Sequence, residues 1–221
     1  ERIQQLAFQD PLTQLPNRRL LIDRLEHALV GATRKQCGGA VLLIDVDNFK
    51  SLNDTRGHDV GDELLRQLGQ RLVGCVHQGD TVARVSGDEF VVLVENLPLA
   101  TGEMVSQARS LCHELLLTLQ QPYTLGGEQH HHSASIGIAL FGNQGHSVAE
   151  LLKQADMAMY RAKDAGRNTL AFFDPQMQAA VDARTGMERA IRDGLQRGEF
   201  VPWYQPQLDE AGRVLGVEAL V

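Results

Sequence analysis

The sequence predicts an α/β (α+β) fold, with one mixed, partly antiparallel sheet and helices packed against it. Apolar runs of strand length alternate with segments whose apolar residues recur at helical spacing. Two short strands flank a Ser-Gly-Asp-Glu turn, and this pattern predicts a β-hairpin and therefore an antiparallel pair. Glycine and proline residues separate the segments, as expected for turns.

The first half of the chain contains a helix, a central strand, a second helix and the hairpin. Asn17 can cap a helix with leucines at positions 20, 21, 25 and 29. Residues 40–46 form a continuous apolar run, typical of a strand buried on both faces. Residues 59–77 carry apolar side chains at helical spacing. The hairpin strands are expected at 81–85 and 90–94.

The second half continues the alternation and then changes character. We expect a helix at 101–120, a strand at 133–140, a helix at 147–165 ended by Gly166, and a strand at 169–173. Residues 177–197 read as a polar helical connector, followed by strands at 200–208 and 214–221. The predicted layout is a helix end at 1–8, a domain at 9–174, a connector at 175–198 and a fragment at 199–221. Two strands alone are marginally stable.

Composition excludes several classes of protein. A formal net charge of -7 over 221 residues argues against a nucleic-acid polymer as partner, although it permits a single nucleotide. Three dispersed cysteines suit a reducing compartment. No apolar run is long enough to span a bilayer and no signal peptide is visible. We therefore expect a cytoplasmic segment, read as an excerpt of a longer protein that can be membrane-anchored upstream.

Acidic residues stand where strands end. Asp45 and Asp47 share one face at the end of the central strand. Asp88 and Glu89 lie in the hairpin turn. If the hairpin pairs beside the central strand, up to four carboxyl groups converge, and a divalent cation would relieve their repulsion. Taken alone, Asp45 and Asp47 are better explained as caps of a turn at residues 48–52, and the spacing of Asp88 and Glu89 is also that of a solvated hairpin tip.

Cationic and amide groups follow in other segments. Lys163 and Arg167, four residues apart at a helix end, are either a phosphate clamp or favourable partners of the helix C-terminus. Asn53 and Asp62 suit the edge of a guanine base, or simple capping. Residues 130–132, three consecutive histidines, are interpreted as a solvated loop because they do not share one face.

Together these clusters resemble the GGDEF family of diguanylate cyclases over residues 8–173. Four motifs occur in the family's order, at 10–18, 44–62, 86–90 and 155–168. Their joint occurrence is far more specific than any one motif. The resemblance implies a fold like the adenylyl-cyclase palm, with a ferredoxin-like core, and condensation of two GTP to cyclic di-GMP with release of pyrophosphate.

The resemblance also implies roles for individual residues. Asp88, Glu89 and Asp45 would be catalytic, with Asp88 activating the attacking 3′-hydroxyl. Mg²⁺ or Mn²⁺ would be held by Asp45, the Val46 carbonyl, Asp88 and Glu89. Substrate-binding positions would be Phe49, Lys50, Asn53, His58, Asp62, Lys163 and Arg167. Because each domain holds one GTP, synthesis would need a second GGDEF domain.

The last residues have a separate resemblance. Residues 203–207 and 216–221 are similar to the first two strands of an EAL cyclic di-GMP phosphodiesterase, a TIM-type barrel. Glu218 matches a metal-binding glutamate of that family. Only these two strands of the barrel are expected in this sequence, so the barrel is truncated. The resemblance implies a parent chain with an upstream sensor and a downstream EAL domain.

Two positions depart from the GGDEF pattern. Ser86 replaces the first glycine of the signature, and its Cβ would restrict both φ and the approach of a phosphate. The family's inhibitory Arg-x-x-Asp is degenerate, with His77 in place of the arginine and Asp80 retained. We therefore expect weak or absent feedback inhibition. Two functions stay open: an active diguanylate cyclase, or a GTP-binding module that regulates the adjoining phosphodiesterase.

Overall fold

A computed structural model describes residues 7–142, 145–175, 187 and 190–220. The chain forms two compact units, Glu1–Asp174 and Pro175–Val221, which are described separately. No helix within the described part is long and apolar enough to cross a membrane. The first unit contains, in order, α2 (Arg18–Lys35), β1 (Gly38–Val46), α3 (Phe49–Arg56), α4 (His58–Cys75), β2 (Thr81–Ser86), β3 (Glu89–Leu97), α5 (Thr101–Leu119), β4 (Tyr123–Leu125), β5 (Glu128–His130), β6 (Ala134–Phe141), α6 (Val148–Asp164) and β7 (Leu170–Phe172).

The first unit is built around a five-stranded sheet in the order β2-β3-β1-β6-β7. β1 pairs antiparallel with both β3 and β6, and β2 pairs antiparallel with β3. β7 adds to β6 in parallel at the opposite edge. The predicted mixed, partly antiparallel sheet is therefore confirmed, and its central strand is the one predicted from the apolar run.

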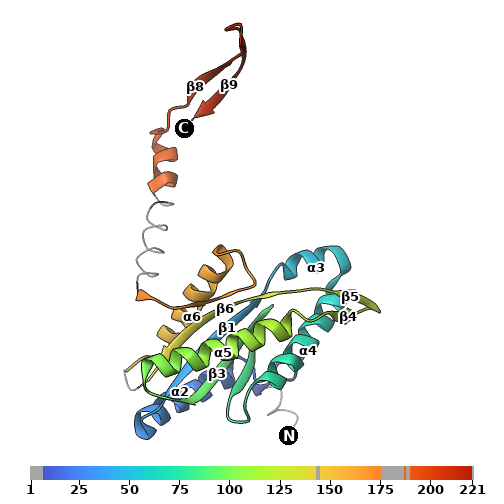
Figure 1. The fold of residues 1–221 in the computed structure, drawn as a ribbon, viewed down its shortest axis with the longest axis vertical. Coiled ribbons are helices and arrows are strands. Elements are labelled where there is room, and N and C mark those ends of the chain that lie inside the picture. Colours follow the sequence, from blue (N-terminus) through green and yellow to red (C-terminus); the bar gives the residue numbers. More distant parts are fainter. Residues whose placement is uncertain (1–6, 143–144, 176–186, 188–189, 221) are drawn as a thin grey trace. The chain divides into compact units, whose positions relative to one another are not determined.

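Two hydrophobic cores lie on opposite faces of this sheet. Alternate residues of β1 point to opposite sides, so Leu42 and Ile44 enter a core with α4 and α5. Val41 and Leu43 enter a second core with α2 and α6. All nine residues of β1 are buried. Figure 1 shows the resulting layers, with α4 and α5 on one face and α2 and α6 on the other.

The start of α2 and the end of α6 follow the predicted capping chemistry. The Asn17 side chain accepts hydrogen bonds from the amides of Arg19 and Leu20, which starts α2. Ser147 and Glu150 form a reciprocal capping box at the start of α6. Gly166 has a φ of 112° just beyond the C-cap of α6, as predicted for a terminating glycine.

Three elements differ from the sequence-based expectation. Residues after Asn48 form the helix α3 rather than a turn. β4 and β5 make a short hairpin that was not predicted, and it puts His130 in a strand rather than a loop. In the predicted hairpin, Ser86 and Glu89 are themselves paired, so the turn comprises only Gly87 and Asp88.

The second unit contains a single hairpin in its described residues. β8 (Trp203–Leu208) pairs antiparallel with β9 (Val214–Leu220), and Gln205 lies opposite Glu218. Asp209 caps the connecting turn by accepting the amides of Ala211 and Arg213. Residues 190–197 are helical, but much of the predicted connector, and residues 1–6 of the predicted first helix, lie outside the described residues.

Candidate active site

The acidic end of β1 and the hairpin turn meet through strand register. Asp45 lies opposite Glu89 of β3 on one side and Ser135 of β6 on the other. The next residue, Val46, donates its amide to the Asp88 carbonyl at 3.4 Å. Register therefore brings together the three carboxylates and the carbonyl-bearing residue that the family resemblance assigns to a metal.

Lys163 of α6 reaches this acidic end. Its Nζ lies 2.7 Å from Asp45 Oδ1, and the Asp45 residue is only 7% exposed. Burial raises the pKa of Asp45, and the negative charges of Asp88 and Glu89 add to that rise, whereas Lys163 opposes it. The pKa of Asp45 therefore stands above its ordinary value even beside an ammonium group, because the carboxylate is desolvated among other acids.

Asp156 is a further acidic group near the site, and it was missed at the level of sequence. Partial desolvation and the charge of Glu89 raise its pKa, while Lys163 lowers it. Asp156 and Lys163 both lie on α6, seven residues apart, and this spacing puts two side chains on one helix face. Helical spacing alone could have predicted that Asp156 belongs to the neighbourhood of Lys163.

Asp47 does not join the carboxylate group as predicted from its position on the strand. It is 3% exposed and accepts hydrogen bonds from the Ser133 and Ser135 hydroxyls at 2.6 and 2.7 Å. It also accepts the Asn168 amide at 3.0 Å. Three donors satisfy the buried carboxylate, so Asp47 fastens β1 to the start of β6 and to the segment after α6. The expected convergence of four carboxylates is thus reduced to three, with Asp156 nearby.

Ser86 and Gly87, the two small residues of the hairpin, differ in backbone conformation. Gly87 has a φ of 42°, in the left-handed region, whereas Ser86 does not have a positive φ. The expected restriction of φ by serine at position 86 is therefore wrong, because the turn requires left-handed backbone only at Gly87. The Ser86 hydroxyl instead donates to the Glu89 carboxylate across the strand pair.

Polar side chains lie where α3 packs against α4. The Asn53 Oδ1 atom is buried and has no hydrogen-bond partner, and a Cβ built at Gly61 would lie 2.0 Å from it. Gly61 thus leaves the space that the Asn53 amide occupies. Asp62 is half-buried on α4, while Lys50 and His58 are exposed at the starts of the two helices. The ring of Phe49 also lies against Gly61.

Arg167 is not on the helix that carries Lys163. α6 ends at Asp164, and Arg167 follows the terminal glycine with a φ of 64°. Its amide donates to the Ala162 carbonyl at 3.2 Å. Lys163 therefore lies in the last turn of the helix, as expected, and Arg167 is held by a left-handed turn just beyond the helix end.

The donor set fits a divalent cation that prefers oxygen. Three carboxylates and one backbone carbonyl are oxygen ligands of the type that Mg²⁺ and Mn²⁺ take. The pKa of Asp45 is raised by burial first and by the charges of Asp88 and Glu89 in addition, and a cation beside the three carboxylates would favour the ionised form. No three His, Cys, Asp or Glu side chains in the described ranges already form a metal cage.

Residues 77–80, which the family resemblance compares with an inhibitory motif, border a hollow of about 850 Å³ between α4, β3 and α5. Asp80 caps its own turn, accepting the His77 amide at 3.0 Å, and it also accepts the Glu95 amide at 3.2 Å. Both oxygens of the retained aspartate are therefore engaged within the chain.

The three histidines are more ordered than a solvated loop. The rings of His130 and His132 stack with centroids 6.4 Å apart, and His132 meets Tyr123 edge-on at 6.2 Å. Burial lowers the pKa of His132, as do its two histidine neighbours. His130 lies in β5 and His132 is half-buried, whereas His131 is exposed, so the expected solvated loop describes only His131.

Residues 7–169 match the family described as "Diguanylate cyclase, GGDEF domain". The chain belongs to the GGDEF family. Over 218 residues it is 43% identical to MucR of Pseudomonas aeruginosa, a bifunctional diguanylate cyclase/cyclic di-GMP phosphodiesterase, covering 98% of this chain and 31% of MucR. It is 35% identical over 221 residues to PdeR of Escherichia coli, a cyclic di-GMP phosphodiesterase, covering 100% of this chain and 32% of PdeR.

Solved GGDEF structures share the fold. A fragment of YfiN (TpbB) from Pseudomonas aeruginosa comprising only the GGDEF domain superposes with a TM-score of 0.73 at 38% identity, covering 79% of this chain and 99% of the fragment. The GGDEF domain of DgcB from Caulobacter crescentus, in complex with c-di-GMP, superposes with a TM-score of 0.68 at 26% identity, covering 75% and 95%. This chain therefore has a GGDEF-type cyclase fold, and it spans about a third of the length of MucR and PdeR.

Proposed function

We propose that this GGDEF domain binds GTP with a divalent cation and, paired with a second GGDEF domain, condenses two GTP to cyclic di-GMP and two pyrophosphates. The observation that carries the proposal is the register of Asp45 with Glu89, which brings the acidic end of β1 to the hairpin turn beside Lys163. Anionic and cationic groups thus meet at the end of the central strand of the sheet, as phosphoryl transfer requires.

Guanine recognition is supported by the polar side chains between α3 and α4. Guanine presents N–H donors on its Watson–Crick edge, and an unpartnered buried acceptor such as Asn53 Oδ1 is chemically matched to them. We assign Asp62 to the same edge and His58 to the guanosine. The main-chain amides near Phe49 and Lys50 would contact phosphate at the start of α3.

The remaining site residues would bind the triphosphate and the cation and would activate the attacking hydroxyl. Lys163 and Arg167 would hold the triphosphate, and Asp88 would accept the proton of the 3′-hydroxyl as it attacks the α-phosphate of the opposing GTP. Asp45, the Val46 carbonyl, Asp88 and Glu89 would hold a cation that lowers the pKa of the hydroxyl and neutralises charge on the phosphates. Each of the two domains holds one GTP, so two reciprocal attacks close the ring.

A second candidate function is a GTP-binding module that regulates an adjoining phosphodiesterase without turnover. It is favoured by the Ser86 hydroxyl, which engages the Glu89 carboxylate, and by relatives such as PdeR that are named as phosphodiesterases. In this case GTP binds at the same groups, but the acidic side chains are not free to assemble for chemistry.

Incubation of the purified chain with GTP and Mg²⁺, followed by detection of cyclic di-GMP and pyrophosphate, separates these candidates. Cyclase activity predicts product that disappears in Asp88→Asn, with GTP binding retained. Tight GTP binding without product supports the regulatory module. Absence of both binding and product contradicts both candidates.

We further propose that residues 199–221 are the start of an EAL domain, joined through the connector at 175–198 to the GGDEF domain at 9–174. The β8–β9 hairpin supports this, since it places Glu218 within a strand. In the parent chain, an upstream sensor ending near residues 1–8 would control synthesis, and a nucleic-acid polymer is not among the proposed partners. Expression of the parent with and without Glu218→Gln, with phosphodiesterase activity measured, tests the assignment.

A further inference from the structure

Asp10 and Arg84, which are 74 residues apart in sequence, form an ion pair next to the hairpin turn. Arg84 Nη1 donates to both oxygens of Asp10, at 3.0 and 3.2 Å. The Arg84 side chain is only 14% exposed and the Asp10 side chain only 17%, so the pair is shielded from solvent. A shielded ion pair with two short contacts has a defined geometry, unlike exposed pairs.

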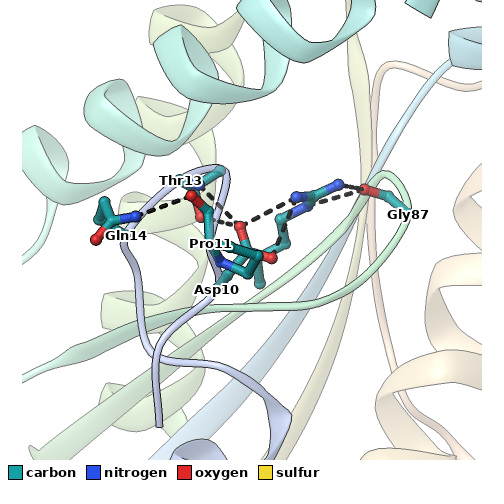
Figure 2. Close-up of polar contacts among 6 residues, drawn as sticks. Asp10, Pro11, Thr13, Gln14 and Gly87 are labelled. Carbon is teal, nitrogen blue, oxygen red and sulfur yellow. Dashed lines mark hydrogen bonds and ion pairs between the residues drawn. The ribbon is translucent and has the colours of Figure 1, made fainter. Parts of the chain in front are cut away.

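The same guanidinium holds the turn itself. Its Nε and Nη2 atoms both donate to the Gly87 carbonyl, at 3.0 and 2.8 Å. These hydrogen bonds put the guanidinium between Asp10 and Gly87, the two labelled residues that dashed lines join to it in Figure 2. Arginine suits this position because its planar fork presents donors in two directions at once. The Gly87 carbonyl belongs to the peptide that leads directly into Asp88.

Asp10 is itself fixed by the segment in which it lies. Its Oδ1 accepts the amide and the hydroxyl of Thr13 at 2.8 and 2.7 Å, and its own amide donates to the Leu15 carbonyl at 2.7 Å. Asn17 also binds the preceding residues. Its backbone amide donates to the Phe8 carbonyl at 2.9 Å, and its side-chain amide donates to the Ala7 carbonyl at 3.1 Å. The segment and the turn are therefore connected through one carboxylate and one guanidinium.

We propose that Asp10 is a positioning residue that acts through Arg84 to fix the Gly87–Asp88 turn against the end of β1. The turn places Glu89 opposite Asp45 and Asp88 beside Val46, and the role in catalysis rests on the proposed cyclase function. The position of the turn is then set by the segment at residues 7–17, so that a shift of this segment changes the geometry of the acidic groups.

Hydrogen exchange tests the positioning role without turnover. Val46 donates its amide to the Asp88 carbonyl, so a loosened turn exposes the Val46 amide. In Asp10→Asn we expect exchange at Val46 and across residues 86–89 to accelerate about ten-fold, the factor expected for one charged hydrogen bond. Thr13→Ala is the matched control, because it removes only the Thr13 hydroxyl from Asp10 and leaves the Asp10–Arg84 pair in place.

Kinetics and coupling complete the test. If the domain is a cyclase, Asp10→Asn should lower kcat with little change in KM. The double variant Asp10→Asn/Arg84→Gln should have the same kcat as Arg84→Gln alone, because Asp10 acts through Arg84. The proposal is overturned if exchange at Val46 and 86–89 is unchanged in Asp10→Asn, or rises equally in Thr13→Ala. Failure of the cyclase function would instead show as absent product with the exchange difference intact.

Discussion

Lys163 Nζ lies 2.7 Å from Asp45 Oδ1, so the residue assigned to phosphate and the residue assigned to metal are paired with each other. GTP and its cation would have to separate them. The lysine thus supplies positive charge at the acidic end of β1 until the ligands arrive, and this arrangement makes metal binding and nucleotide binding depend on the same side chain.

Replacing this lysine should separate the two binding events. In Lys163→Met, the carboxylates of Asp45, Asp88 and Glu89 lose their cationic neighbour, so Mn²⁺ alone should bind about ten-fold more tightly, equivalent to about 1.4 kcal/mol. GTP with metal should bind more weakly. Electron paramagnetic resonance of free Mn²⁺ measures the first effect. Lys153→Met, on an exposed part of the same helix, is the control, and an unchanged Mn²⁺ affinity in Lys163→Met would contradict the prediction.

Gly61→Ala should weaken GTP binding without unfolding the domain. The new Cβ would displace Asn53 Oδ1, which lies 2.0 Å from the Cβ position. We expect the GTP affinity to fall by about ten-fold or more, the equivalent of one hydrogen bond to the base. Gly74→Ala on the same helix meets nothing within 4 Å and should raise the free energy of unfolding by up to about 1 kcal/mol with GTP affinity unchanged. Calorimetric titration and urea denaturation of both variants give the comparison.

Substitutions at Ser86 distinguish its hydroxyl from its Cβ. Because the residue does not have a positive φ, we expect Ser86→Gly to change GTP affinity by less than about three-fold, under 1 kcal/mol. Ser86→Ala should behave alike, because both variants release the Glu89 carboxylate from the hydroxyl. A large gain in GTP affinity in Ser86→Gly, absent from Ser86→Ala, would show that the Cβ obstructs the phosphates and that this expectation is wrong.

Gly137→Ala should strongly destabilise the domain. A Cβ at this position in β6 would lie 2.0 Å from the Ala155 carbonyl oxygen and 2.1 Å from the Met159 amide nitrogen, both backbone atoms of α6. Backbone cannot move aside as a side chain can, so we expect the free energy of unfolding to fall by about 3 kcal/mol or more. Gly31→Ala in α2 meets nothing within 4 Å and should not destabilise. Equal urea midpoints for the two variants would refute the close packing of β6 on α6.

Stability should fall in mild acid because of His132. Burial lowers the pKa of this histidine below its ordinary 6.5, so the unfolded chain binds a proton that the folded chain does not. The contribution is therefore fully present above about pH 6.5 and is lost as the pH falls through the lowered folded pKa. Urea unfolding of wild type and His132→Gln between pH 8 and pH 5 checks this: the variant should show a shallower decline. Parallel declines would exclude His132 as the cause.

Much of the fold follows from local patterns in the sequence. The apolar run at β1 and the helical spacing in α4 and α6 identify elements whose burial is set by periodicity. α3 was missed because its eight residues are largely polar and it has only one fully buried side chain, Leu52. The β4–β5 hairpin was missed because strands of three residues carry too few alternations to stand out.

The site could be predicted in its composition better than in its geometry. Asp45, Asp88 and Glu89 were identified from strand ends, and register brings them together. Asp47 does not join these carboxylates because it accepts hydrogen bonds from Ser133, Ser135 and Asn168, which are 86 to 121 residues away in sequence. The contact between Asp10 and Arg84 spans 74 residues. Spacing along one segment contains no information about partners so distant.

The left-handed backbone at Gly87 has a consequence for how relatives of this domain are recognised. Of the two small residues before the acidic pair, only Gly87 has a conformation that excludes most other residues. A search pattern that demands glycine at both positions would therefore reject chains that form the same turn with serine first. A criterion based on the single obligatory glycine, the acidic pair and an arginine three residues before that glycine describes the turn that this sequence builds.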